Sequence, residues 1–164
     1  MAYIGLISDT HCLFDDKLRK FLEPVDTIWH AGDFGNLETA EAIAAFKPLT
    51  GVYGNCDGYD IRAIHPITQA IETGGLKILM THIGGYPGHY DNRALQMIYS
   101  YRPDVFICGH SHILRVMNDK NLGMMVLNPG AAGKFGFHQV RTALRFHIEE
   151  GKLCDMEVWE WPKD

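Results

Sequence analysis

Short apolar runs, each about the length of a β-strand, recur along the chain and are followed by glycine or by a polar residue that can bind a ligand. Between several of these runs, apolar side chains recur every three or four residues, which is the spacing of one face of an α-helix. The pattern therefore predicts alternating strands and helices. The predicted strands cover residues 3–7, 25–29, 49–53, 76–80 and 105–108, and the predicted helices cover residues 15–23, 36–47 and 91–101.

Three pairs of strand-like segments, each joined by a turn of polar residues or glycine, predict β-hairpins. Strand–helix units followed by hairpins favour two layers of sheet with the helices outside. The predicted fold is therefore α/β (α+β), with two mixed β-sheets packed as a sandwich and flanked by helices. The paired segments are 67–72 with 76–80, 113–118 with 123–127, and 142–148 with 152–161.

Length and composition predict one compact domain, residues 1–164. With 46% hydrophobic residues the chain can bury a substantial core, and 164 residues are too few for two ordinary domains. No apolar run approaches the roughly 18 residues of a membrane span, and four scattered cysteines favour reduced thiols over disulfides. We expect a cytoplasmic protein with no membrane partner. The apolar hairpins could either fill the core or join two copies of the chain in a homo-oligomer.

The net charge of the chain restricts the kinds of molecule that it can be expected to bind. The chain has 15 Lys and Arg residues against 20 Asp and Glu residues, a net charge of −5. Proteins that bind nucleic acid without sequence preference use a basic surface, which this composition does not supply. Polymeric DNA or RNA is therefore disfavoured as a substrate.

Groups that can bind a metal ion follow five of the predicted strands. Asp9 and His11 follow the first strand, and Asp33 follows the second. Because ligands of open α/β sheets collect at the carboxyl ends of the strands, we expect these groups to meet at one edge. The five strand ends supply seven candidate metal ligands with mixed nitrogen and oxygen atoms: Asp9, His11, Asp33, Asn55, His82, His110 and His112.

Seven convergent ligands are more than one cation usually takes, which favours two divalent metal ions that share a carboxylate. A pair of metal ions is a standard device for the hydrolysis of phosphate esters. Two cations lower the pKa of a bridging water enough to give a hydroxide nucleophile near neutral pH, and they neutralise charge on the phosphoryl oxygens. The ligand set therefore predicts a hydrolase without a side-chain nucleophile.

The order of these groups resembles the calcineurin-like metallophosphoesterases, whose motifs run D-x-H, G-D, G-N-H-[ED], a single His and G-H-x-H. The resemblance spans residues 9–112, and the size of the chain is similar to that of the small single-domain phosphodiesterases of bacteria and archaea in that family. The matching motifs are Asp9-Thr10-His11, Gly32-Asp33, Gly54-Asn55-Cys56-Asp57, His82 and Gly109-His110-Ser111-His112.

The resemblance implies a dinuclear phosphodiesterase that acts on small or nucleotide-like phosphodiesters. Manganese is the favoured metal, and iron, zinc or nickel would fit the same ligands. The implied catalytic residues are Asp33, Asn55, Cys56 and Asp57. The implied ligands are Asp9, His11 and His112 for the first metal, Asn55, His82 and His110 for the second, and Asp33 as the bridge.

Cys56 departs from the family pattern, in which many members have a histidine after the asparagine. A thiol donates only weakly and has a reference pKa of about 8.5, so it is a poor replacement for an imidazole that assists the leaving group. We therefore expect diesters with good leaving groups to be cleaved in preference to monoesters. Asp57 is expected to orient its loop through hydrogen bonds, and His30 to be a core histidine.

The sequence leaves two questions open: the role of one glycine-rich segment and an alternative function. The glycine-rich segment from Gly84 to His89 follows a predicted ligand and is expected to be a mobile loop, either in contact with substrate or merely beside the site. The main alternative function is a non-catalytic or weakly catalytic protein-binding scaffold, since a retromer subunit shares this fold. Loss of metal ligands would favour that scaffold, and all seven are present.

Overall fold

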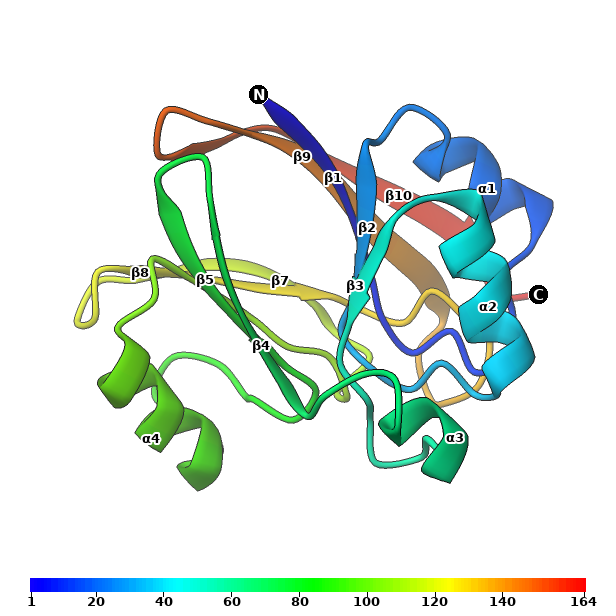
Figure 1. Cartoon of the computed structure of the whole chain (residues 1–164), viewed down its shortest axis with the longest axis horizontal. Helices are drawn as coiled ribbons and strands as arrows, with labels where there is room; N and C mark the ends of the chain where they lie inside the picture. Colours follow the sequence, from blue (N-terminus) through cyan, green and yellow to red (C-terminus); the bar gives the residue numbers. More distant parts are fainter.

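The computed structural model describes residues 1–164 as two mixed, five-stranded sheets packed face to face (Figure 1). Their strand orders are β10-β9-β1-β2-β3 and β4-β5-β6-β8-β7. The predicted sandwich is thereby confirmed. The strands are β1 (Ala2–Ile7), β2 (Thr27–His30), β3 (Leu49–Gly51), β4 (Thr68–Thr73), β5 (Leu76–Thr81), β6 (Val105–Ile107), β7 (Leu114–Asp119), β8 (Met124–Pro129), β9 (Val140–Glu149) and β10 (Lys152–Pro162).

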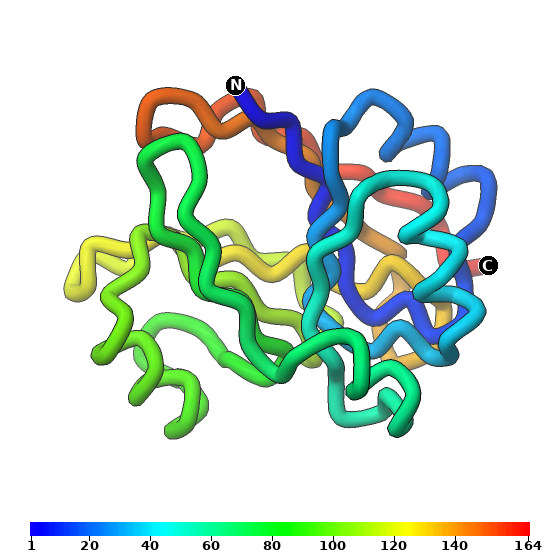
Figure 2. The backbone as a smooth tube through the Cα atoms, in the orientation of Figure 1, coloured from blue at the N-terminus to red at the C-terminus, as the bar shows by residue number.

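Each sheet has a parallel and an antiparallel part; the parallel strands form one side of the first sheet and the centre of the second. Strands β1, β2 and β3 are parallel in the first sheet, as are β5, β6 and β8 in the second. The hairpins add β9 and β10 beside β1, and they place β4 and β7 at the edges of the second sheet. Figure 2 shows the C-terminal hairpin returning alongside the N-terminal strand. All three predicted hairpins are confirmed.

Apolar side chains fill the space between the sheets. Ile4 and Leu6 of β1 belong to the same buried cluster as Ile78 and Met80 of β5. Ile7, the next residue of β1, instead packs on the opposite face of the sheet. This division follows from the alternation of side chains along a strand and explains why the strands are apolar on both faces.

Helices cover the outer face of each sheet, as Figure 1 shows. Leu22 and Ile43 pack from two helices against Ile28 of the first sheet, whereas Ile98 packs against Phe106 of the second. None of the helices is long and apolar enough to cross a membrane. The helices are α1 (Asp16–Leu22), α2 (Leu37–Phe46), α3 (Tyr59–Arg62) and α4 (Asn92–Tyr101).

Two local predictions differ from the structure. The predicted strand 49–53 ends at Gly51, because the N–H of Tyr53 leaves the sheet and donates to the carbonyl of Pro66. Helix α3 was not predicted, since it has a single turn and buries only Ile61. A segment this short gives no helical repeat in the sequence.

A buried arginine joins the C-terminal hairpin to the start of α1. The guanidinium of Arg141 is 2.9 Å from each carboxylate oxygen of Asp15, and its Nε donates to the carbonyl of Ala132. Asp15 also accepts from the N–H of Leu18 and so caps α1. The hydrogen bonds from Arg141 lower the pKa of Asp15 below its usual 3.8. This stabilisation is therefore complete above that value and is lost as the pH falls below it.

Substitution Asp15→Ala should lower the free energy of unfolding by about 3 kcal/mol, because it leaves a buried guanidinium unpaired and removes a helix cap. The matched control Asp16→Ala, which removes the exposed neighbouring carboxylate, should change it by less than about 0.5 kcal/mol. Urea unfolding at neutral pH measures both values. Equal losses in the two variants would contradict the role given to the Asp15–Arg141 pair.

Candidate metal centre

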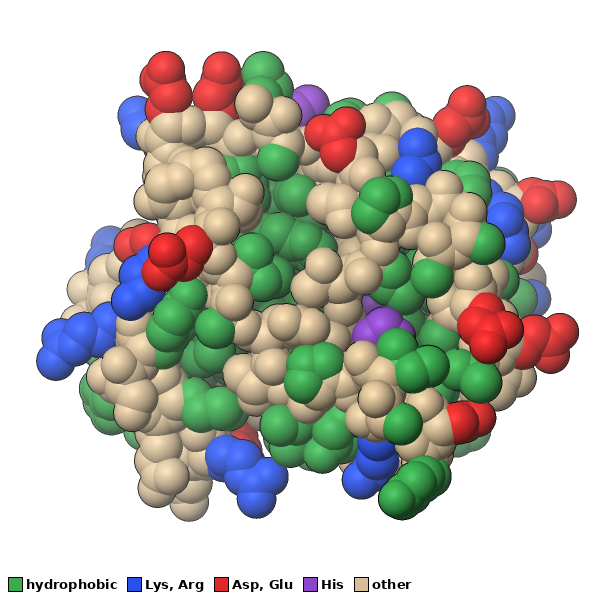
Figure 3. Space-filling model, viewed as in Figure 1, with side chains coloured by type: hydrophobic (Ala, Val, Ile, Leu, Met, Phe, Trp, Pro, Cys, Tyr) green, Lys and Arg blue, Asp and Glu red, His purple; other side chains and the backbone are tan.

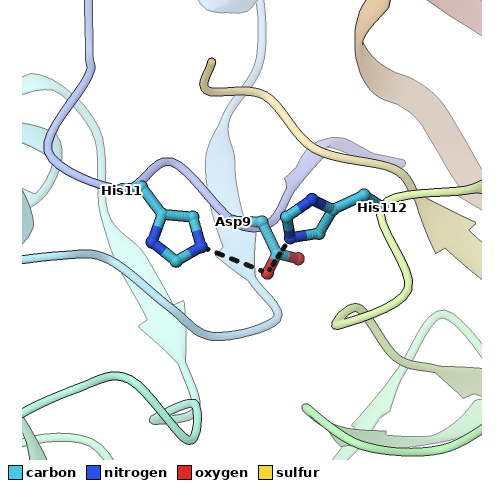
Figure 4. Close-up of side chains that lie close together, drawn as sticks. All are labelled: Asp9, His11 and His112. Carbon is cyan, nitrogen blue, oxygen red and sulfur yellow. Dashed lines mark hydrogen bonds and ion pairs between the residues drawn. The ribbon is translucent and has the colours of Figure 1, made fainter. Parts of the chain in front are cut away.

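Asp9 follows β1 and is fully buried, with its two carboxylate oxygens in different surroundings. Its Oδ2 accepts from the Ser8 hydroxyl at 2.6 Å and from the His110 N–H at 3.1 Å. Its Oδ1 lies 3.2 Å from Nε2 of His112 and 3.7 Å from Nε2 of His11 (Figure 4). One oxygen is thus fixed by the protein, while the other faces these two imidazoles and lies 3.9 Å from Nε2 of His82.

Asp33, which follows β2, repeats this arrangement. Its Oδ1 accepts from the N–H of Cys56 at 2.9 Å. Its Oδ2 lies 3.2 Å from Nε2 of His82 and 3.6 Å from Nε2 of His11. The free oxygen of Asp33 therefore faces imidazoles from both sheets, as a shared ligand would.

His82 offers a nitrogen that has no partner within the protein. Its Nδ1 is 2.7 Å from the carbonyl oxygen of Ala31, and because a carbonyl can only accept, Nδ1 carries the proton. Nε2 then has a free lone pair; it is buried and makes no hydrogen bond, although Oδ2 of Asp33 lies close by. A positive charge between these two atoms, either a proton or a metal ion, would satisfy both, so this nitrogen fits a metal ligand.

Asn55 and His110 complete the other side of the cluster. The side-chain oxygen of Asn55 is 3.1 Å from Nδ1 of His110, and the rings of His110 and His82 are 5.2 Å apart. Burial and the nearby His82 lower the pKa of His110, which keeps its imidazole neutral and able to bind a metal. Asn55 and His110 therefore lie next to His82, although His110 belongs to neither of the two groups of close donor atoms around the carboxylates.

Two groups of donor atoms are close enough to hold an ion each. The ligand atoms of Asp9, His11 and His112 lie within 4.8 Å of one another, as do those of Asp9, Asp33 and His82. Asp9 belongs to both groups, and the free oxygen of Asp33 faces both His11 and His82. The donor set is mixed imidazole and carboxylate, which suits divalent transition metals such as manganese, iron and zinc.

The carboxylates remain ionised despite their burial. Burial alone would raise the pKa of Asp9, but the nearby imidazoles of His11 and His112 hold it well below its usual range. Burial likewise disfavours charge on His82, and the Asp33 carboxylate more than offsets this and raises the pKa of that imidazole. The site therefore concentrates negative charge where imidazole nitrogens converge, which favours a cation.

The backbone at the ligands is unusual. Left-handed backbone angles are uncommon outside glycine and cluster at functional sites, where the surrounding structure enforces them. Five of the seven predicted ligands adopt them: Asp9 (φ 53°), His11 (φ 41°), Asp33 (φ 62°), His110 (φ 70°) and His112 (φ 63°).

Asp57 lies behind the ligands and ties their loops together. Its carboxylate accepts from the N–H groups of Asp33 at 2.9 Å, Gly54 at 2.8 Å and Gly35 at 3.1 Å. With its oxygens occupied in this way, it orients the loop of Asp33 and leaves metal binding to other groups. Cys56 is exposed in the same loop, with Sγ 3.6 Å from the side-chain nitrogen of Asn55.

The remaining sequence candidates take supporting places. His30 is fully buried, contacts the Thr10 hydroxyl at 3.0 Å and stacks on Phe34. Burial lowers its pKa to about 3, so it stays neutral. The segment from Gly84 to His89 lines a cavity of about 480 Å³ that also reaches His110.

Sequence reasoning gave no role at the site to three groups that lie around the ligands. The side-chain nitrogen of Asn128 donates to the carbonyl of Gly109 at 3.0 Å and so holds the loop of the last two ligands. Phe135 lies against His11, with ring centroids 4.8 Å apart, and His138 lies against His112 at 5.0 Å. Only the Asn-Pro-Gly sequence at 128–130 gave a signal; the other contacts join segments distant in the chain.

Comparison with known proteins identifies the family. Residues 3–151 match the family model described as the calcineurin-like phosphoesterase superfamily domain. The chain belongs to this family. The resemblance inferred from the five motifs is thereby confirmed, and with it a place among metal-dependent phosphoesterases.

Relatives of similar length support the assignment. A probable metallophosphoesterase of Mycoplasma pneumoniae is 26% identical over 170 residues and is aligned over the full length of both chains. The structure is also similar to that of an archaeal phosphodiesterase (TM-score 0.67, 24% identity, 96% and 99% of the two chains). A Vps29 variant from Entamoeba histolytica has a TM-score of 0.75 at 20% identity, over 98% of each chain. At these identities the two structures establish the shared fold.

Substitution Gly54→Ala should weaken manganese binding by more than about tenfold, because the new Cβ would overlap Oδ1 of Asp33 and displace that carboxylate. Gly58→Ala is a matched control in the same loop, where the nearest atom to a new Cβ is Asp60 Oδ1 at 3.5 Å. Calorimetric titration with manganese measures both affinities, with circular dichroism to check the fold. Unchanged affinity in Gly54→Ala would contradict the placement of Asp33 in the metal centre.

Proposed function

We propose that the protein is a dinuclear metal-dependent phosphodiesterase that hydrolyses small or nucleotide-like phosphodiesters. The observation that carries this proposal is the pair of buried carboxylates, each with one oxygen held by hydrogen bonds and the other turned toward imidazole nitrogens. That arrangement supports two cation positions side by side. The family assignment supports phosphoester chemistry at them.

We assign to these residues the roles that the resemblance implies. Two bound divalent cations would supply activated water and neutralise charge on the phosphoryl oxygens. The free oxygen of Asp33, which faces imidazoles from both sheets, supports its assignment as the bridge. We assign Asp9, His11 and His112 to the first metal and Asn55, His82 and His110 to the second, with manganese as the preferred ion.

Preference for diesters rests on Cys56. Partial loss of hydration and the nearby Asp33 carboxylate raise the pKa of this thiol, so it stays protonated and is a weak hydrogen-bond donor near neutral pH. A monoester needs more help in releasing its leaving group than a diester with a stable aryloxide does. The acidic net charge of −5 further favours small substrates over polymeric nucleic acid. Four free cysteines support a reducing compartment such as the cytoplasm.

Metal-stripped protein should hydrolyse bis(p-nitrophenyl) phosphate only after manganese is added, with about two metal ions bound per chain. Asp33→Ala should lower the rate at saturating manganese on the order of 10³-fold, because it removes the proposed shared ligand. The exposed Asp60→Ala is the control and should retain the wild-type rate. Release of p-nitrophenol and elemental analysis give the two readings. Equal rates for Asp33→Ala and wild type would rule out the dinuclear mechanism.

Substitution Cys56→His should raise the ratio of p-nitrophenyl phosphate to bis(p-nitrophenyl) phosphate hydrolysis by at least about tenfold, because a protonated imidazole would offset the second negative charge that only the monoester carries. Cys56→Ala, which removes the thiol without adding an imidazole, should keep the wild-type ratio. Steady-state kinetics with both esters provides the comparison. A fall in monoester hydrolysis at unchanged metal content would instead give the thiol a role of its own.

The Vps29 likeness favours a second candidate, a protein-binding scaffold of the same fold. A scaffold has no need of an unpartnered buried imidazole nitrogen beside two ionised carboxylates, and His82 provides one here. The hydrolysis experiment separates the two candidates. Absence of both metal binding and turnover would favour the scaffold.

A further inference from the structure

A cavity of about 450 Å³ opens beside the second group of metal ligands. Asn55 and His82 line it, so it is continuous with the proposed metal centre. It lies between the loop after β3 and the start of α4, and it adjoins the cavity lined by the Gly84–His89 segment, with which it shares Ile83 and Asp91. A volume of this size is typical of small-molecule sites and exceeds what one phosphoryl group needs.

One wall of the cavity is apolar and open to solvent. Ile67 and Ile83 line it with 42% and 41% of their surfaces exposed, and Met97 and Tyr53 extend the same wall. Isolated exposed apolar residues are ordinary, but several that line one cavity next to polar groups are typical of a ligand site. This wall suits an aromatic ring, such as a nucleobase, or another largely apolar body.

Two arginines line the same cavity, although the protein is acidic overall. Arg62 is held in place: its Nε donates to the carbonyl of Asp57 at 2.8 Å, and its guanidinium lies 4.6 Å from the centre of the Tyr53 ring. Arg93 makes no ion pair or side-chain hydrogen bond. Figure 3 shows basic side chains on either side of an apolar group at the lower edge of this face.

The only carboxylate that lines the cavity is already engaged. Asp91 caps α4, and its Oδ2 accepts from the N–H groups of Arg93 and Ala94. It therefore holds the first turn of the helix and does not pair with the Arg93 guanidinium. An unpaired guanidinium beside an apolar wall favours an anionic group on the ligand, because its planar fork can donate two parallel hydrogen bonds to a phosphate.

We propose that this cavity binds the non-scissile arm of the substrate, and that Arg93 recognises a second phosphate on that arm. The proposal rests on the proposed function and specifies its substrate class: a phosphodiester that carries a largely apolar group and a further phosphate, as in a short oligonucleotide. The scissile group lies at Asn55 and His82, the apolar body lies along Ile67 and Ile83, and the second phosphate reaches Arg93.

Binding of two product-like nucleotides to the manganese-loaded protein tests this assignment without turnover. Thymidine 3′,5′-bisphosphate should bind about tenfold more tightly than thymidine 5′-monophosphate, since one charge-assisted contact is worth about 1.4 kcal/mol. In Arg93→Ala the difference should shrink to about twofold, the statistical advantage of two phosphates. Arg102→Ala, which removes an exposed arginine from the other end of α4, is the matched control and should keep the tenfold preference.

Calorimetric titration of the wild type and the two variants gives the three affinity ratios. Equal affinities for the two nucleotides in the wild type, or a tenfold preference that persists in Arg93→Ala, would overturn the proposal. If hydrolysis of bis(p-nitrophenyl) phosphate persists in either case, only the cavity assignment fails and the proposed function stands. If instead the nucleotide preference follows Arg93 but no ester is cleaved, the cavity assignment stands and the hydrolase proposal fails.

Discussion

The structure depends on the way in which two buried carboxylates divide their oxygens. Asp9 and Asp33 each give one oxygen to donors of the protein and turn the other toward imidazole nitrogens. Burial of two charges is costly unless they are paired, and here hydrogen bonds and imidazoles from both sheets supply the pairing. Left-handed backbone at five ligands is the conformational cost of bringing these groups together. The sandwich is therefore organised around a cation site.

Much of this arrangement could be predicted from the sequence, because parallel strands bring their carboxyl ends to one edge. Asp9 and Asp33 follow β1 and β2, and apolar runs mark both strands. The role of Asp57 could be expected only in outline, since its three donors come from segments up to 24 residues away. The protonated nitrogen of His82 could not be predicted at all, because it is set by the carbonyl of Ala31, which follows β2 of the other sheet.

The same fold serves proteins of different kinds, so the function has to be argued from the site. Vps29 from Entamoeba histolytica and an archaeal phosphodiesterase both share the architecture at 20% and 24% identity. A metal-dependent phosphoesterase needs several metal-ligand atoms whose lone pairs are not already taken up by hydrogen bonds within the protein. His82, with a buried nitrogen that makes no hydrogen bond, supplies such an atom. The cavity beside it, with Arg93 unpaired, adds a place for the rest of a substrate.

Anomalous diffraction from crystals grown with manganese would test the central claim most directly. The account predicts two manganese peaks, one on each side of the free oxygen of Asp33. The first should be bound by Asp9, His11 and His112 and the second by Asn55, His82 and His110. A single peak, or two peaks that do not share Asp33, would contradict the dinuclear centre proposed for this protein.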